Sequence, residues 1–319
     1  MNRRAFIGTS TAFLLAPHTA GAQPAGKLPR IGALGTGRPA LLQQGLRDMG
    51  YVEGQNIVIE WRDAEGKPER FGELAADLVR LKVEIIVASN PAATLAARSA
   101  TSSIPIVMIN TPDPIQLGLV TSLGRPGGNI TGPTTLSADL TSKQLDLLKE
   151  AVPRAGRVAV LWNPVNPWHP LALKAAETAA RSLALQIYGV ESRDGEGLAP
   201  AFAAMTKERA GAVIVLSDPM TFFHRARVAE LAASRRLPTM CGVRGYVDAG
   251  GLMSYWAHQE DLYRRVASYV DRILKGARPG ELPIEQPTRF ELVINLQTAR
   301  ALKLAIPRSL LQQADVVIE

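Results

Sequence analysis

The sequence predicts an α/β protein of two similar lobes, each a doubly wound parallel sheet, joined by a three-segment hinge. The first observation is a pair of short apolar runs, 85–88 and 106–109, separated by a helix-length segment of small residues. Such runs are typical of parallel strands that are buried on both faces. The second observation is that one series of strand and helix patterns occurs twice. The third is the length of 319 residues, which suits about two domains.

The first series of elements fills residues 30–131. It alternates apolar runs with longer segments of helical composition, the order typical of a parallel sheet covered by helices. The expected strands are 30–34, 56–60, 85–88, 106–109 and a short 129–131. The expected helices are 40–49, 68–81 and 92–100.

The second series repeats this order from residue 140 onward. Its expected helices are 140–150, 171–183, 198–208 and 222–235, and its expected strands are 157–161, 185–190, 212–216 and 237–241. Four landmarks recur at offsets of 127, 131, 128 and 133 residues: 30–34 with 157–161, 60–66 with 191–197, 89–91 with 217–219, and 104–105 with 237–238. Common ancestry or shared fold constraints both explain the match, and either predicts two similar α/β lobes.

The remaining tail is too long for a simple extension of the second lobe. It contains a strand-like run at 251–255, a helix at 261–275, a proline-rich stretch at 279–287, a strand at 290–294 and a short helix from Gln297. We therefore expect three crossings between the lobes, near 131–134, 255–258 and 282–287. This predicts lobe 1 as 28–132 plus 256–283 and lobe 2 as 133–255 plus 284–319, with a ligand cleft between them.

Residues 1–22 have the pattern of a secretory signal peptide. Arg3 and Arg4 precede an apolar stretch, and Ala20-Gly21-Ala22 suits a small-x-small cleavage site. The paired arginines fit both a Sec and a twin-arginine signal. We therefore expect export to the periplasm. The single cysteine, Cys241, lies far from the cleavage point, so we expect no lipid-anchor cysteine.

The charge of the chain gives little support for a nucleic-acid partner. Removal of residues 1–22 removes two arginines and no acidic residue, which lowers the formal net charge from +7 to +5. The lysines and arginines are scattered along the chain, whereas nucleic-acid binding favours a basic stripe or patch. We expect no nucleic-acid partner, and we expect a monomer.

The loops that follow the strands are the expected place for a ligand, because open parallel sheets bind ligands at the carboxyl ends of their strands. Asn90, Asp113 and Asp218 also suit helix capping, which is compatible with ligand contact. Trp162 would either close the edge of the sheet or form an aromatic wall, and Tyr246 and Trp256 lie near a crossing, where a cleft wall is expected. The candidate ligand-binding residues are Thr36, Ser89, Asn90, Asn110, Asp113, Trp162, Asn163, Asp218, Gly242 and Tyr255.

Other site types have weaker support in the sequence. Gly35-x-Gly37-x-x-Ala40 with Glu60 resembles a dinucleotide-binding fingerprint, but the matching loop at 162–164 has no glycine, which favours a plain strand-to-helix turn. The histidines do not have metal-ligand spacing, so we expect no metal and no cofactor. Ser89 and Ser217 precede Asn90-Pro91 and Asp218-Pro219, which favours helix starts over nucleophiles.

Four motifs together resemble the ABC-transporter substrate-binding protein family with a type I periplasmic-binding fold, the group that includes tryptophan- and tyrosine-binding members. They are Gly50-Tyr51-Val52-Glu53-Gly54-Gln55-Asn56, Asp113-Pro114-Ile115-x-x-Gly118-Leu119-Val120, Arg125-Pro126-Gly127-Gly128-Asn129-Ile130-Thr131-Gly132 and Phe290-Glu291-Leu292-Val293-Ile294-Asn295. The likeness covers nearly the whole mature chain. One departure is the segment 35–41, which looks shorter than the family's usual loop at the cleft.

The resemblance implies a binding protein rather than an enzyme. It would capture a small organic ligand, an amino acid or an aromatic acid, by closure of the lobes, and would deliver it to an ABC transporter permease in the inner membrane. A sensory protein that reports to a receptor is an alternative, and neighbouring genes would distinguish the two. An exported α/β enzyme is a further alternative, which would need a nucleophile–base pair that the sequence does not display.

Overall fold

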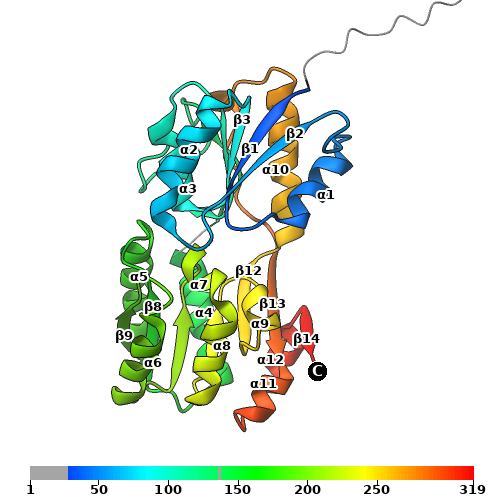
Figure 1. The fold of residues 1–319 in the computed structure, drawn as a ribbon. Coiled ribbons are helices and arrows are strands. Elements are labelled where there is room, and N and C mark those ends of the chain that lie inside the picture. Colours follow the sequence, from blue (N-terminus) through cyan, green and yellow to red (C-terminus); the bar gives the residue numbers. More distant parts are fainter. Residues whose placement is uncertain (1–27, 136–137) are drawn as a thin grey trace, which may run out of the picture.

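The structure is a computed structural model that describes residues 28–135 and 138–319. The predicted signal peptide, residues 1–22, lies outside the described residues. Two sheets, each flanked by helices, lie end to end along the long axis of the molecule (Figure 1). Within 28–135 and 138–319, no helix combines the length and the apolar character that crossing a membrane requires.

The first sheet is entirely parallel, with the strand order β2-β1-β3-β4-β6. Its strands are β1 (Arg30–Gly35), β2 (Val58–Asp63), β3 (Ile85–Ala88), β4 (Ile106–Met108) and β6 (Ile130–Thr131). Every residue of β3 and β4 is buried, which agrees with the continuous apolar runs from which these strands were predicted. Two further short strands, β5 (Thr111–Pro112) and β7 (Thr134–Thr135), pair with each other.

Helices cover both faces of the first sheet. They are α1 (Ala40–Asp48), α2 (Phe71–Arg80), α3 (Pro91–Ala100) and α10 (Gln259–Leu274), with 3-10 turns η1 (Pro68–Arg70) and η2 (Pro279–Glu281). On one face, Ile31 and Val87 pack with α1 and α10, and on the other Leu34 and Ile86 pack with α2 and α3 (Figure 1). Alternate strand residues thus face opposite helix layers, as the pleat of a strand requires.

The second sheet has the order β14-β13-β12-β11-β10-β8-β9. Its strands are β8 (Arg157–Trp162), β9 (Gln186–Glu191), β10 (Ala212–Val215), β11 (Thr239–Cys241), β12 (Met253–Ala257), β13 (Phe290–Asn295) and β14 (Val316–Ile318). The expectation of a purely parallel sheet fails at one pair, because β12 and β13 are antiparallel. The physical reason is the path of the chain: β12 leads toward the first sheet and β13 returns from it, so Ala257 pairs with Phe290.

The helices of the second part of the chain also form two layers. They are α4 (Ala138–Ala151), α5 (His169–Ser182), α6 (Leu198–Lys207), α7 (Pro219–Phe223), α8 (Arg225–Ser234), α9 (Gly245–Asp248), α11 (Leu296–Ala301) and α12 (Arg308–Gln313). The helix predicted at 222–235 is two helices that meet at His224, and the first begins early because Asp218 caps it ahead of Pro219. The sequence did not predict α9, α12 or β14.

The chain passes between the two sheets at three places in the described residues. It leaves the first sheet after β6, returns between β12 and α10, and leaves again between η2 and β13. These connections are joined to one another by backbone bonds: the Thr134 amide donates to the Glu285 carbonyl (2.9 Å) and the His258 amide to the Arg289 carbonyl (3.0 Å). The return brings α10 against α1, so residues 259–274 complete one face of the first sheet.

Candidate ligand-binding site

A cavity of about 180 Å³ lies between the two sheets, at the carboxyl ends of their strands. Six of the ten residues that the sequence proposes for ligand contact line it: Thr36, Ser89, Asn90, Asn110, Asp218 and Gly242. The first four follow strands of the first sheet, and the last two follow strands of the second. Loops at equivalent places in the two lobes therefore face one cavity.

The other four proposed residues do not line the cavity. Asp113 caps a local turn, where its Oδ1 accepts from the Gln116 amide (3.1 Å). Trp162 packs against the hydrophobic core of the second sheet. Tyr255 stacks on Phe290, with ring centroids 5.6 Å apart.

The fourth, Asn163, acts behind the cavity by holding Asp218. Its Nδ2 donates to Asp218 Oδ1 (3.1 Å), and Asn166 Nδ2 donates to Asp218 Oδ2 (2.9 Å). Asp218 Oδ1 also accepts from the Met220 amide (2.9 Å) at the start of α7. The carboxylate is 4% exposed and accepts these three hydrogen bonds. These three donors fix the position of the carboxylate at the edge of the cavity.

His169 is buried beside this network and is held in its neutral form. Its Nδ1 accepts from the Asn163 amide (2.8 Å), which leaves Nε2–H to donate to the Ser217 carbonyl (3.2 Å). Burial lowers the pKa of His169, although the nearby Asp218 opposes this effect. The imidazole contacts the backbone of Ser217, and the buried Ser217 Oγ has no hydrogen-bond partner in the described residues. This geometry lacks the bond between nucleophile and base that activates a serine.

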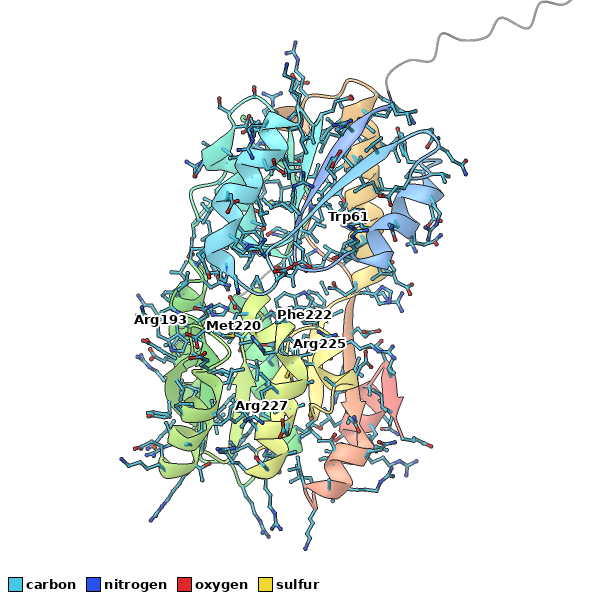
Figure 2. All side chains as sticks on the ribbon, viewed as in Figure 1. Trp61, Arg193, Met220, Phe222, Arg225 and Arg227 are labelled. Carbon is cyan, nitrogen blue, oxygen red and sulfur yellow. The ribbon has the colours of Figure 1, made fainter. Side chains whose placement is uncertain are left out.

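Aromatic side chains form much of the cavity wall: Trp168, Phe222, Tyr246, Trp256 and Tyr263. The sequence singled out Tyr246 and Trp256 but missed the other three. Trp168 immediately precedes α5, Phe222 lies in α7, and Tyr263 lies in the second turn of α10. Figure 2 shows Phe222 and Met220 at the end of the second lobe that faces the first. All three residues lie at or near the start of a helix that follows a strand end or a crossing. This position in the sequence is the signal that could have identified them.

Trp256 connects the two lobes directly. It lies on β12, and its indole Nε1–H donates to Oδ1 of Asn110, which follows β4 (3.2 Å). Asn110 has a left-handed backbone with φ 50°, a conformation that asparagine adopts more readily than most residues. Because successive residues of a strand point to opposite sides, Trp256 faces the cavity and Tyr255 faces away from it.

The charge of the cavity constrains its ligand. Among the described lining residues, Asp218 is the one acidic side chain, and neither lysine nor arginine is present. A ligand cation or amine next to Asp218 is therefore favoured over a bare anion. A ligand carboxylate would depend on hydroxyl groups and on the amino-terminal end of α3, whose dipole attracts negative charge.

The glycine-containing turn after β1 has a packing role. A Cβ on Gly35 would lie 2.1 Å from Ser89 Oγ, so glycine is required for the close approach of β1 to the loop after β3. Glu60, the acid of the apparent dinucleotide fingerprint, forms ion pairs with Arg30 (3.5 Å) and Arg62 (3.7 Å). Gly35 and Glu60 therefore each have a structural partner within the first lobe.

Gly242→Ala is expected to lower ligand affinity at least tenfold. The new Cβ would lie 1.9 Å from Ser217 Oγ and 3.2 Å from the Trp256 ring, so two cavity side chains would have to move. Isothermal titration calorimetry would measure the loss. Gly72→Ala is the matched control, because a Cβ there meets nothing within 4 Å and lies in the exposed first turn of α2. Unchanged affinity in Gly242→Ala would contradict the placement of this wall.

Comparison with known proteins places this geometry in context. A family model described as ABC transporter substrate binding protein matches residues 40–318. A protein named tyrosine-binding protein, from Clostridioides difficile, is 26% identical over 258 residues, which are 81% of this chain and 74% of the relative.

Two solved structures are also similar. One is the structure of an ABC domain in complex with L-Trp, from Streptococcus pneumonia, which is 26% identical to this chain. The match covers 92% of this chain and 100% of the chain in that structure, with a TM-score of 0.84. The other is the ligand-free, open structure of a substrate binding protein with adhesive properties, from Clostridium difficile, which is 21% identical. The match covers 91% of this chain and 99% of the chain in that structure, with a TM-score of 0.63. Both structures share the fold of this chain, and the TM-score is higher for the L-Trp complex.

Proposed function

The chain belongs to the ABC transporter substrate binding protein family, and from this premise we propose that it captures a small organic ligand by closure of its two lobes and delivers it to an ABC importer. The observation that carries the proposal is the interlobe cavity lined by matched strand-end loops. Ligand groups that bridge the lobes stabilise the closed form over the open one. The closed form is then the shape that the membrane permease binds.

We propose the lobe boundaries given by the sequence, 28–132 plus 256–283 and 133–255 plus 284–319. The packing of α10 on α1 supports the assignment of 256–283 to lobe 1. The connecting segments lie side by side and are hydrogen-bonded to one another, and Arg265 on α10 forms an ion pair with Glu285 of the third crossing (3.0 Å). Hinge segments that lie side by side favour rotation of the lobes about one axis. Such a rotation closes the cleft without sliding one lobe past the other.

Contacts across the cleft support a closed arrangement of the lobes. The Trp256–Asn110 hydrogen bond joins the second lobe to the first. At the rim, Phe223 of α7 lies against Gly66 of the loop after β2, where an added Cβ would lie 2.8 Å from Phe223 Cβ. The higher TM-score with the L-Trp complex than with the ligand-free, open structure agrees with this arrangement.

The ligand class that suits the cavity best is an aromatic amino acid. Its ring would lie among the aromatic side chains of the wall, whose faces and edges attract other rings. Its ammonium group would lie next to Asp218, and its carboxylate near the Ser89 and Ser217 hydroxyls and the start of α3. The names of the two relatives at 26% identity, one tyrosine-binding and one in complex with L-Trp, agree with this class. An aromatic acid without an amine would leave Asp218 unpaired.

The remaining parts of the proposal concern chemistry and location. We propose that no bond is made or broken, because the geometry of Ser217 and His169 does not activate a nucleophile. We also propose that residues 1–22 direct the chain to the periplasm, where it acts as a monomer. Transport rather than sensing is favoured by membership of the family.

A thermal-shift screen against aromatic amino acids, other amino acids, aromatic acids and sugars tests the proposed function. A ligand present at 100 times its Kd should raise the free energy of unfolding by about 2.7 kcal/mol. We expect aromatic amino acids to stabilise the protein and the corresponding aromatic acids to have no effect at the same concentration. Stabilisation by sugars alone would contradict the proposed ligand class.

A further inference from the structure

The end of the second lobe that points away from the ligand cavity carries an excess of basic side chains. The strands β8 to β12 are parallel, so the connections that lead into them meet at one edge of the sheet, opposite the edge at the cavity. Each connection runs from the last residue of a helix to the first residue of the next strand. Together they contain two acidic residues, Glu208 and Asp248, and six basic residues, which we call the basic edge: Arg154, Arg157, Lys207, Arg209, Arg235 and Arg236.

Most of the basic edge has no acidic partner. Of the two acidic residues, Glu208 is paired with Arg157 (3.2 Å) and Asp248 with Arg244 (3.2 Å). Side chains with nitrogen at their tips project from this end of the molecule (Figure 2). Four members of the basic edge are exposed and form no ion pair within 28–135 and 138–319: Arg154, Lys207, Arg209 and Arg236.

The first lobe shows that helix ends alone do not account for this charge. Basic residues are common at the carboxyl ends of helices, because they complement the helix dipole. The helix-to-strand connections of the first sheet are 48–58, 80–85 and 100–106, and they contain two basic and three acidic residues. The excess of positive charge is therefore particular to the second lobe. The basic residues are scattered along the sequence, and the fold gathers six of them at one edge.

The composition of the basic edge suits an extended anionic surface better than a protein partner. Protein interfaces depend on a few aromatic or large apolar anchors. The connections into β8–β12 contain no aromatic residue, on which a nucleic-acid base could stack. Clustered lysines and arginines without such anchors are typical of attraction to anionic lipid headgroups. None of the exposed large apolar side chains of the described residues lies in these connections; they are Leu28, Met49, Ile115, Val165, Phe223 and Val317.

We propose that the basic edge binds the surface of a bilayer that contains anionic phospholipids, through the phosphate groups of several headgroups. This inference goes beyond ligand capture, and it rests on the proposed function in one respect, the export of the chain to a compartment bounded by membranes. The attraction is electrostatic, so each exposed cation adds to it and salt weakens it. The cavity lies at the opposite edge of the sheet and faces away from the bilayer (Figure 1), so docking and ligand capture do not compete.

Vesicle sedimentation of the processed protein, without residues 1–22 and without ligand, tests this inference. The vesicles consist of equal parts of phosphatidylglycerol and phosphatidylcholine, or of phosphatidylcholine alone. We expect binding to the anionic vesicles only, weakened at least about tenfold when salt is raised from about 0.05 M to about 0.3 M. The triple variant Arg154→Gln, Lys207→Gln and Arg236→Gln removes one exposed cation from each of three connections. It should bind the anionic vesicles at least about tenfold more weakly than the wild type.

The matched control is the triple variant Lys67→Gln, Lys82→Gln and Arg193→Gln. It removes the same charge from exposed positions outside the basic edge that have no ion pair among the described residues. Lys82 has the same left-handed backbone as Arg236, with φ 54° and 53°, so each triple variant changes one such position. The control should bind the anionic vesicles within about threefold of the wild type, since the charges that contact the bilayer are kept. Thermal unfolding of both variants checks the fold.

The outcomes separate this inference from the proposed function. Equal binding to both kinds of vesicle, binding to neither, or an equal loss in the two triple variants would overturn the assignment of the basic edge. Tighter binding to duplex DNA than to the anionic vesicles at the same salt would overturn it in favour of a nucleic-acid partner. The thermal-shift screen should give the same stabilising compounds for the basic-edge variant as for the wild type, because its three positions lie outside the cavity. A wild-type protein that no compound stabilises would count against the proposed function alone.

Discussion

Asp218→Asn is expected to weaken binding of an amine-bearing ligand by at least a hundredfold. The substitution removes the one acidic group among the described cavity residues, and the ligand ammonium would then be buried without a counter-charge. Loss of one partner of a buried pair typically costs about 3–5 kcal/mol, which corresponds to a factor of about 100 or more. Calorimetric titration with the ligand found by the thermal-shift screen would measure the change.

The same variant is also expected to lose stability. Asp218 accepts from Asn163, Asn166 and the Met220 amide, so an amide side chain would place an N–H group opposite one of these donors. An unsatisfied buried group costs about 1–3 kcal/mol. Asp248→Asn is the control, because Asp248 is 51% exposed and forms a surface ion pair with Arg244 (3.2 Å). Normal affinity in Asp218→Asn, with the control also normal, would show that Asp218 is only a structural cap.

Val266→Asp is expected to unfold the first lobe or to destabilise it by more than about 4 kcal/mol. Val266 is fully buried on α10, in the cluster that contains Ile31, Val87 and Leu46. A buried carboxylate has no partner there and must lose its hydration or its charge. Urea unfolding followed by circular dichroism would measure the loss.

The control for this variant is the same substitution at an exposed valine. Val165→Asp introduces an aspartate at a position that is 50% exposed, so the free energy of unfolding should change by less than about 0.5 kcal/mol. Near-normal stability in Val266→Asp would contradict the assignment of residues 256–283 to lobe 1. It would also weaken the proposed three-segment hinge.

The sequence best predicted the features of the fold that depend on a few adjacent residues. The apolar runs at 85–88 and 106–109 became β3 and β4, and the repeated Ser-Asn/Asp-Pro landmark became two helix starts at one cavity. In each case Asn90 or Asp218 caps a helix that begins at the following proline. Capping preference and strand-end position act over a few residues, so the sequence alone displays them.

The sequence was least informative about which side of an element faces the cleft. Tyr255 and Trp256 are neighbours, and the register of β12 decides which of them reaches the cavity. Register depends on pairing with β11 and β13, which are distant in the chain. The antiparallel direction of β13 likewise follows from the return path through the first lobe. Long-range packing sets both features, and local composition carries no signal for them.

The hydrogen bonding of Asp218 implies that substitutions in the first lobe can change ligand preference with less effect on folding than substitutions in the second lobe. One carboxylate caps α7, anchors two asparagines and faces the cavity, so any redesign of that corner also alters folding. Thr36 has no such structural partner in the described residues. A library aimed at new ligands should therefore vary the first lobe around Thr36 and keep the Asp218 corner fixed.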